Sequence, residues 1–285
     1  MLSQFTKPHA IGLRAIRSGD PQEEGAPTMN ASGLFTSALA FAAALMIGPR
    51  SGQAAEIHAL ITTAMKAAVD ELTPAFERTG GDSVRVSYGP SGGLARRFVA
   101  GEPADVIIID SGALEDLIRQ GKVLPGRIDI ARTGIGIAVR KGAPRPDVSS
   151  PEALKRALLA AKSIGHTAPA GGGITAAHIT KLFERLGIAA EVAPKVRLAA
   201  GGPNGRVSAL VSSGVAEIGL QQVSELMSNP GVEVIGMLPP ELQQITVYSA
   251  GIATTAKEPD AGRALISFLS VPEAIAIYKT RGLMF

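Results

Sequence analysis

Four short turns in this sequence combine the residue types that bind small anions. Each turn follows an apolar run and precedes a helical pattern, and each joins small residues to hydroxyl or amide side chains. Unpaired N–H groups at the start of a helix, with a hydroxyl donor beside them, attract an anion without a formal cation. The predicted anion-binding turns are Ile61-Thr62-Thr63-Ala64, Gly89-Pro90-Ser91-Gly92-Gly93, Gly171-Gly172-Gly173-Ile174-Thr175 and Gly201-Gly202-Pro203-Asn204-Gly205.

A plainer interpretation exists for each turn taken alone. Ser91, Thr175 and Asn204 are residue types that cap helices, and the glycines serve turn geometry. Four such turns in one chain favour a shared binding site over four unrelated caps. Arg206 directly follows the fourth turn, so it is the candidate cationic anchor if the anion is a carboxylate. Gln222, beside Gln221, suits carboxylate oxygens as well.

Other kinds of chemistry have little support. The chain has no cysteine, which excludes disulfides, thiol nucleophiles and cysteine zinc sites. Its four histidines are too dispersed for a metal site, and no nucleotide-binding glycine motif occurs, so we expect no metal and no cofactor. A net charge of +3 with scattered basic residues predicts no nucleic-acid partner. The few residues available as a general base are Asp110, Glu225, His178 and Tyr88, and none lies in a catalytic motif.

The elements around these turns predict an α/β fold. Short runs rich in Val and Ile alternate with amphipathic helical segments, which is typical of mainly parallel sheets. Strands are predicted at Glu56–Thr62, Ser83–Tyr88, Asp105–Asp110, Ile135–Arg140, Ser163–His166, Val196–Leu198, Ile218–Gln221 and Ile245–Ala253. Helices are predicted at Met65–Arg78, Leu94–Ala100 and Ala113–Gln120, from Pro151 with Ser150 as cap, from Gly173 to Leu186, up to Ser213, and twice near the C-terminus, the second from Pro272. Because open α/β sheets bind ligands at strand carboxyl ends, the turns should meet.

The N-terminal region reads as a leader rather than as part of the fold. Leu34–Gly48 is an uncharged apolar run, shorter than the about 20 residues that span a membrane. Small residues follow it as in a signal-peptide cleavage site near Ala54 or Ala55. We therefore expect residues 1–55 to be a leader and cleaved signal peptide, and the protein to be periplasmic. An uncleaved anchor and a true start at Met29 are the alternatives.

Several segments resemble the molybdate-binding periplasmic protein family, a branch of the type II solute-binding proteins of ABC importers. The resemblance covers nearly all of residues 56–285, and its most specific part is LARRFVAGEPADV, from Leu94. It implies a two-lobed fold with a ligand cleft between lobes, made of 56–132 with 250–285 and of 133–249. It also implies two crossovers, near Ala131–Ile137 and Ile245–Gly251.

The same resemblance implies a set of ligand-binding residues. The family's first serine falls near Ala64, beside Thr62 and Thr63, and its second falls on Ser91. A late tyrosine found in some members falls on Gln222. Its third and fourth contacts fall near Thr175 and Asn204. The implied ligand-binding set, joined by the anchor inferred from the turns, is Thr62, Thr63, Ser91, Gly92, Thr175, Asn204, Arg206 and Gln222.

Three functions follow as hypotheses. The first is a monomeric binding protein that captures a small anion, either a molybdate-like oxyanion or an organic acid, for the membrane subunits of an ABC importer. The second is a periplasmic isomerase of a small tricarboxylic acid, because a divergent branch of the family that includes aconitate isomerases resembles this chain. The third, a structural or adhesion protein, predicts no ligand. The turn pattern argues against the third hypothesis, and because no candidate base lies in a catalytic context, we expect binding without turnover.

Overall fold

A computed structural model describes residues 54–169, 174–200 and 206–285 of the 285-residue chain. These residues belong to one compact unit. The expected leader up to residue 53, the glycines at 171–173 and Asn204 lie outside the described residues. The described residues therefore include nearly all of the segment in which strands and helices were predicted.

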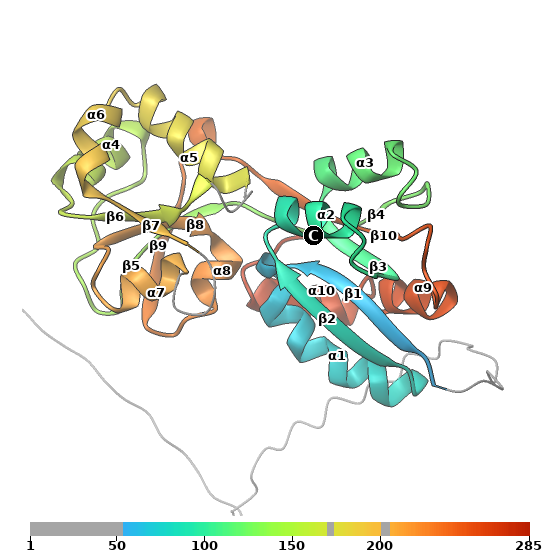
Figure 1. Ribbon diagram of the computed structural model, residues 1–285. Coiled ribbons are helices and arrows are strands. Elements are labelled where there is room, and N and C mark those ends of the chain that lie inside the picture. Colours follow the sequence, from blue (N-terminus) through green and yellow to red (C-terminus); the bar gives the residue numbers. More distant parts are fainter. Residues whose placement is uncertain (1–53, 170–173, 201–205) are drawn as a thin grey trace, which may run out of the picture. The chain divides into compact units, whose positions relative to one another are not determined.

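The first sheet has five strands in the order β2-β1-β3-β10-β4. Its helices come from both ends of the described chain, so that α9 and α10 lie beside elements formed from the N-terminal part (Figure 1). The strands are β1 (Glu56–Thr62), β2 (Ser83–Gly89), β3 (Val106–Asp110), β4 (Ile128–Thr133) and β10 (Thr246–Ile252); the helices are η1 (Thr63–Met65), α1 (Lys66–Gly80), α2 (Ser91–Val99), α3 (Ser111–Arg119), α9 (Pro259–Phe268) and α10 (Pro272–Thr280).

The second sheet also has five strands, in the order β7-β6-β8-β5-β9. All of its elements come from the middle of the chain (Figure 1). They are β5 (Ile135–Arg140), α4 (Pro151–Ala160), β6 (Ile164–Thr167), α5 (Ile174–Arg185), α6 (Ala189–Val192), η3 (Ala193–Lys195), β7 (Val196–Ala199), α7 (Val207–Ser212), β8 (Ile218–Gln222), α8 (Val223–Met227), β9 (Val232–Met237) and η4 (Pro240–Leu242).

One strand in each sheet runs against the other four. In the first sheet it is β10, which pairs antiparallel with both β3 and β4. In the second it is β5, which pairs antiparallel with β8 and β9. The predicted two-lobed α/β fold with mostly parallel sheets is thus confirmed. The odd strand in each sheet follows from the chain passing between the sheets, because β10 and β5 are the first strands after each passage.

The chain changes sheet twice. It leaves the first sheet at Gly134, between β4 and β5, within the expected crossover range. It returns through residues 238–245, just ahead of the range expected for the second crossover. Strand β10 spans the expected lobe boundary at 249 and 250 and lies wholly in the first sheet.

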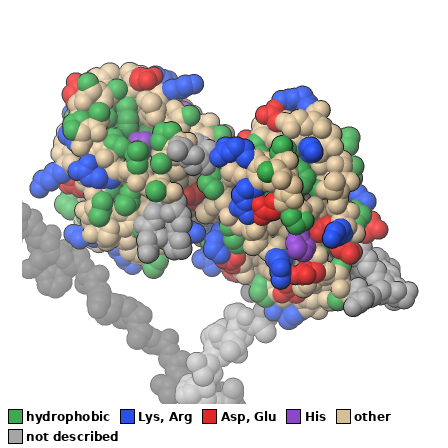
Figure 2. Space-filling view, in the orientation of Figure 1, with side chains coloured by type: hydrophobic (Ala, Val, Ile, Leu, Met, Phe, Trp, Pro, Cys, Tyr) green, Lys and Arg blue, Asp and Glu red, His purple; other side chains and the backbone are tan. Residues whose placement is uncertain are grey.

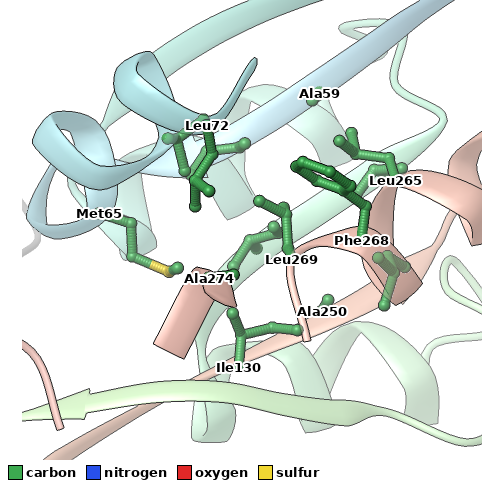
Figure 3. Close-up of a cluster of buried hydrophobic side chains, with 14 of the residues drawn as sticks. Ala59, Met65, Leu72, Ile130, Ala250, Leu265, Phe268, Leu269 and Ala274 are labelled. Atoms are coloured by element: carbon green, nitrogen blue, oxygen red, sulfur yellow. The ribbon is translucent and has the colours of Figure 1, made fainter. Parts of the chain in front are cut away.

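The first sheet is buried on both faces, and the strand periodicity explains how. Successive side chains of a strand point to opposite faces, so a sheet covered on both sides needs continuous apolar runs. Val106 and Ile108 pack with α1, α9 and α10, whereas Ile107 and Ile109 pack with α2 and α3. Figure 3 shows the first of these clusters, in which Phe268, Leu265 and Leu72 come together. The run VIIID is therefore a central strand.

Glycines on the second sheet allow α7 to approach it closely. A Cβ added to Gly219 of β8 would lie 2.5 Å from Val211 Cγ2 and 2.9 Å from Val207 Cγ1. A Cβ at Gly165 of β6 would lie 2.9 Å from Ala216 Cβ. A larger side chain at Gly219 would push α7 away from the sheet, and one at Gly165 would displace the segment that follows α7. These glycines thus set the position of Arg206, which immediately precedes α7.

Several predicted elements differ in extent from the observed ones. Helix α2 begins at Ser91, three residues before the predicted start, because Pro90 takes the cap position and Gly92 and Gly93 continue the first turn. Strands β4 and β9 were not predicted. Ser150 caps α4 as predicted, accepting a hydrogen bond from Ala153 N at 3.1 Å.

No single helix among the described residues is long and apolar enough to cross a membrane. The bent pair α9 and α10 passes such a test by length and composition, and both helices contribute side chains to the core of the first sheet.

Candidate functional site

A cavity of about 250 Å³ lies where strand ends from the two sheets come together. The pairing registers explain part of this grouping, because Thr62 pairs with Gly89 and Thr167 pairs with Ala199 at the last positions of their strands. The residues around the cavity are Thr62, Thr63, Tyr88, Gly89, Pro90, Ser91, Thr167, Ile174, Thr175, Ala199, Arg206, Val207, Gln221, Gln222, Glu225 and Tyr248. The cavity thus lies at the carboxyl ends of parallel strands from both sheets.

The first sheet supplies a wall of hydroxyl groups. Ser91 is the first residue of α2, and its Oγ accepts a hydrogen bond from Asp110 N at 3.0 Å. Because that contact uses an acceptor site, the Ser91 proton stays available for an acceptor in the cavity. The first N–H groups of α2 are also unpaired within the helix. Together with Thr62 and Thr63, this wall presents donors and no formal charge.

The second sheet supplies amides held by a hydrogen-bond network. Gln221 Nε2 donates to Thr167 Oγ1 at 2.6 Å and to Glu225 Oε2 at 3.0 Å. Gln221 Oε1 accepts from Gln222 N at 3.0 Å, and Gln222 Nε2 lies 3.4 Å from Thr246 Oγ1. Both glutamines are buried. Their side chains are therefore fixed in place before any ligand arrives.

Glu225 and Arg206 are the charged side chains at this cavity among the described residues. Burial raises the pKa of Glu225 from its ordinary 4.5 to about 7, while Arg206 and the hydrogen bond from Gln221 oppose the rise. A carboxyl group with this pKa exchanges its proton near neutral pH. The site can therefore hold a cation, a titratable carboxyl and neutral donors within one small volume.

Tyr248 links the two sheets at the cavity. It lies on β10, is 1% exposed, and has its pKa raised far above the ordinary value by burial and then by the charges of Glu225 and Asp110. Hydrogen bonds from Gln222 and Thr62 oppose that rise. Since Thr62 belongs to the first sheet and Gln222 to the second, a single neutral hydroxyl contacts side chains of both.

The structure brings most of the predicted site residues to this cavity. Those around it are Thr62, Thr63, Ser91, Thr175, Arg206 and Gln222. Gly92 is not among its lining residues, because it lies one position further into α2. Asn204 lies outside the described residues. Ser91 is not a side-chain cap, because Pro90 occupies that position.

Four cavity residues were not predicted, namely Thr167, Ala199, Val207 and Tyr248, and two of them, Thr167 and Tyr248, carry hydroxyl groups. Thr167 is the last residue of β6, as Thr62 is of β1. A search for hydroxyl residues at the carboxyl ends of strands would therefore have found it. Tyr248 lies within a strand rather than at a turn, and nothing in its local sequence marks it. Its place follows from the antiparallel pairing that sets Tyr248 opposite Asp110, at the end of β3.

The four candidate bases separate into two groups. Glu225 and Tyr88 lie at the cavity, and the pKa of Tyr88 is raised by burial and by Asp70, which accepts a hydrogen bond from its hydroxyl at 2.7 Å. Asp110 caps α3 by accepting from Ala113 N at 3.0 Å. His178 Nε2 lies 2.7 Å from Leu242 O, away from the cavity lining.

A metal site lacks support in the described part of the chain. The described residues contain no group of three or more His, Asp or Glu side chains able to hold a metal ion. Figure 2 shows Lys and Arg side chains distributed among acidic, apolar and other side chains on the face drawn. The charged chemistry of interest is therefore that of the cavity.

Comparisons with known proteins agree with this arrangement. Residues 57–283 match the family described as bacterial extracellular solute-binding protein. An aconitate isomerase from Pseudomonas sp is 32% identical over 222 residues, which is 75% of this chain and 82% of that protein. The molybdate-binding protein ModA of Azotobacter vinelandii is 28% identical over 243 residues, covering 81% and 91% of the two chains.

Solved structures share the fold. The periplasmic molybdate-binding protein of Azotobacter vinelandii superposes with a TM-score of 0.65 at 20% identity, covering 80% of this chain and 99% of the other. The sulfate-binding protein SubI of Mycobacterium tuberculosis gives a TM-score of 0.63 at 17% identity, covering 80% and 86%.

Proposed function

The chain belongs to the family of bacterial extracellular solute-binding proteins, and we propose that it captures a small organic acid in the cavity between its two sheets. The observation that carries this proposal is the presence of Arg206 beside Glu225 in a cavity otherwise surrounded by neutral donors. A guanidinium pairs with a carboxylate through two parallel hydrogen bonds. The Ser91 proton supplies a further donor to a carboxylate oxygen.

The cavity has room for a small organic acid. The volume of about 250 Å³ is many times the ~30 Å³ that one water molecule occupies in the liquid. An ionised Glu225 would repel any anion, whereas a protonated Glu225 can donate a hydrogen bond to it. The ligand-binding set in this proposal is the predicted one, namely Thr62, Thr63, Ser91, Gly92, Thr175, Asn204, Arg206 and Gln222.

The rest of the proposal concerns setting and partners. The protein is exported to the periplasm, loses residues 1–55 in the process, and works as a monomer that delivers its ligand to the membrane subunits of an ABC importer. Its lobes follow the two sheets, so the boundary predicted at 249 and 250 moves to the start of β10. Ligand oxygens contact both lobes, so that closure excludes water and strengthens each hydrogen bond.

A thermal-shift panel on residues 56–285 tests the proposal. A dye is needed as reporter because the chain has no Trp. The panel holds molybdate, tungstate, sulfate, phosphate, citrate, tricarballylate, and cis- and trans-aconitate. Ligand at 100 times its Kd adds about 2.7 kcal/mol, and each kcal/mol raises Tm by about 2–4 °C. A shift with the organic acids alone supports the proposal, and a shift with molybdate or tungstate alone contradicts it.

Isomerisation of a tricarboxylic acid is the second candidate function. The observation that favours it is the position of Glu225 at the cavity, with a pKa of about 7, since a general base works best with a pKa near the operating pH. The aconitate isomerase relative gives the substrate to test. Conversion of cis- to trans-aconitate, followed by proton NMR, should be abolished by Glu225→Gln if the protein turns over. Absence of conversion by the unchanged protein leaves binding as the function.

A further inference from the structure

A second cavity of about 180 Å³ adjoins the first. The two share Thr63, Arg206 and Glu225, which therefore form the partition between them. The second cavity is completed by residues of α1 and α8 and the position after α8, namely Lys66, Ala67, Asp70, Ser224 and Ser228. An elongated ligand in the first cavity would thus reach a separate set of polar groups by passing the partition.

The charges at the second cavity are arranged for an anion. Lys66 Nζ lies 2.5 Å from Asp70 Oδ2 and 4.4 Å from the centre of the Tyr88 ring, so this cation is held in place. The other carboxylate oxygen of Asp70 accepts from the Tyr88 hydroxyl at 2.7 Å. Both carboxylate oxygens of Asp70 therefore already have partners. When Glu225 is protonated, the cavity holds two cations, Lys66 and Arg206, and one carboxylate, Asp70.

Ser224 adds an independent sign that this cavity receives a ligand. Its side chain is 3% exposed, and its Oγ has no hydrogen-bond partner among the described residues. Leaving a buried hydroxyl unpaired costs about 1–3 kcal/mol, so such groups are rare in folded proteins. Ser224 lines the second cavity, so rotation of its side chain would bring the unpaired hydroxyl to a ligand oxygen there.

We propose that the second cavity is a subsite for an additional carboxylate of the ligand, bound by Lys66, Ser224 and Arg206. This inference rests on the proposed capture of an organic acid and specifies its class. The ligand then carries at least two carboxylates, one near Ser91 in the first cavity and another beyond the Thr63, Arg206 and Glu225 partition. Monocarboxylates fill the first cavity alone and bind more weakly.

Calorimetric titration of the 56–285 protein with tricarballylate and with butyrate tests the subsite. The unchanged protein should bind tricarballylate at least about tenfold more tightly. Lys66→Gln and Ser224→Ala should each weaken tricarballylate binding about tenfold, the loss of one hydrogen bond to a charged group, while changing butyrate affinity less than twofold. Lys122→Gln, an exposed lysine that is outside both cavity linings, is the control and should change neither.

The stability of the variants separates binding from folding. Ser224→Ala removes an unpaired buried hydroxyl, so its Tm without ligand should equal or exceed that of the unchanged protein. An unchanged preference for tricarballylate in both variants would overturn the subsite while leaving organic-acid capture intact. If neither acid binds the unchanged protein, the proposed capture fails and the subsite fails with it.

Discussion

The two walls of the cavity use different chemistry. The wall from the first sheet offers the hydroxyls of Thr62, Thr63 and Ser91 without a formal charge. The wall from the second sheet brings Arg206 and Glu225, with amides fixed by the Gln221 network. Neutral hydrogen-bond donors can bind many different oxyanions. A cation beside a titratable carboxyl group instead makes binding depend on the charge of the ligand and on pH. The difference assigns general anion capture to one wall and discrimination to the other.

Removing the cation should have the largest effect. Arg206→Gln is expected to weaken tricarballylate binding by about 2–5 kcal/mol, because it deletes the guanidinium and leaves a buried carboxylate of the ligand without its partner. Titration calorimetry at pH 7 measures the loss. Arg197→Gln is the matched control, since Arg197 is exposed and donates to the nearby carbonyls of Pro194 and Val196. Equal affinity in both variants would remove Arg206 from the discriminating wall.

The titratable carboxyl should make stability depend on pH. The pKa of Glu225 is about 7 in the folded protein and 4.5 ordinarily, so the folded state holds this proton more tightly. Unfolding then releases a proton between these pH values, and stability falls as pH rises from 4.5 to 7. The penalty above pH 7 is about 3–4 kcal/mol, at about 1.4 kcal/mol for each pKa unit.

Glu225→Gln should remove that penalty. Urea unfolding gives the free energy of unfolding of the variant and of the unchanged protein at pH 5 and at pH 8. The variant should be the more stable of the two at pH 8. Glu184→Gln replaces an exposed glutamate of α5 and serves as control. If the unchanged protein and Glu225→Gln lose the same stability between the two pH values, the carboxyl ionises as an ordinary one.

A single donor from the neutral wall should matter least. Ser91→Ala is expected to weaken binding by about 1–3 kcal/mol for every anion that binds, because it removes one hydrogen bond to a charged group. Thermal shifts across the full panel check whether the loss is uniform. Ser83→Ala changes an exposed serine of β2 and should have no effect. A loss confined to one anion would contradict the general role given to this wall.

The comparison also indicates where sequence reasoning succeeds. Thr62, Ser91 and Thr175 were predicted because each lies where a strand gives way to a helix, and that pattern is local. The central strands were predicted because a strand covered on both faces needs an unbroken apolar run, as in Val106–Asp110. Strand β9 was missed because its residues are all partly exposed or exposed and interrupted by Glu233 and Gly236.

Local pattern alone therefore decided the secondary structure near the turns, the α/β class and the chemical type of the site. Tertiary structure decided which residues meet. Tyr248 reaches the cavity because β10 returns from the second sheet and pairs with β3. Glu225 acquires a raised pKa because α8 buries it near Arg206, and no spacing in the chain encodes that burial. Periodicity depends on neighbours along the chain, whereas burial and charge coupling depend on neighbours in space.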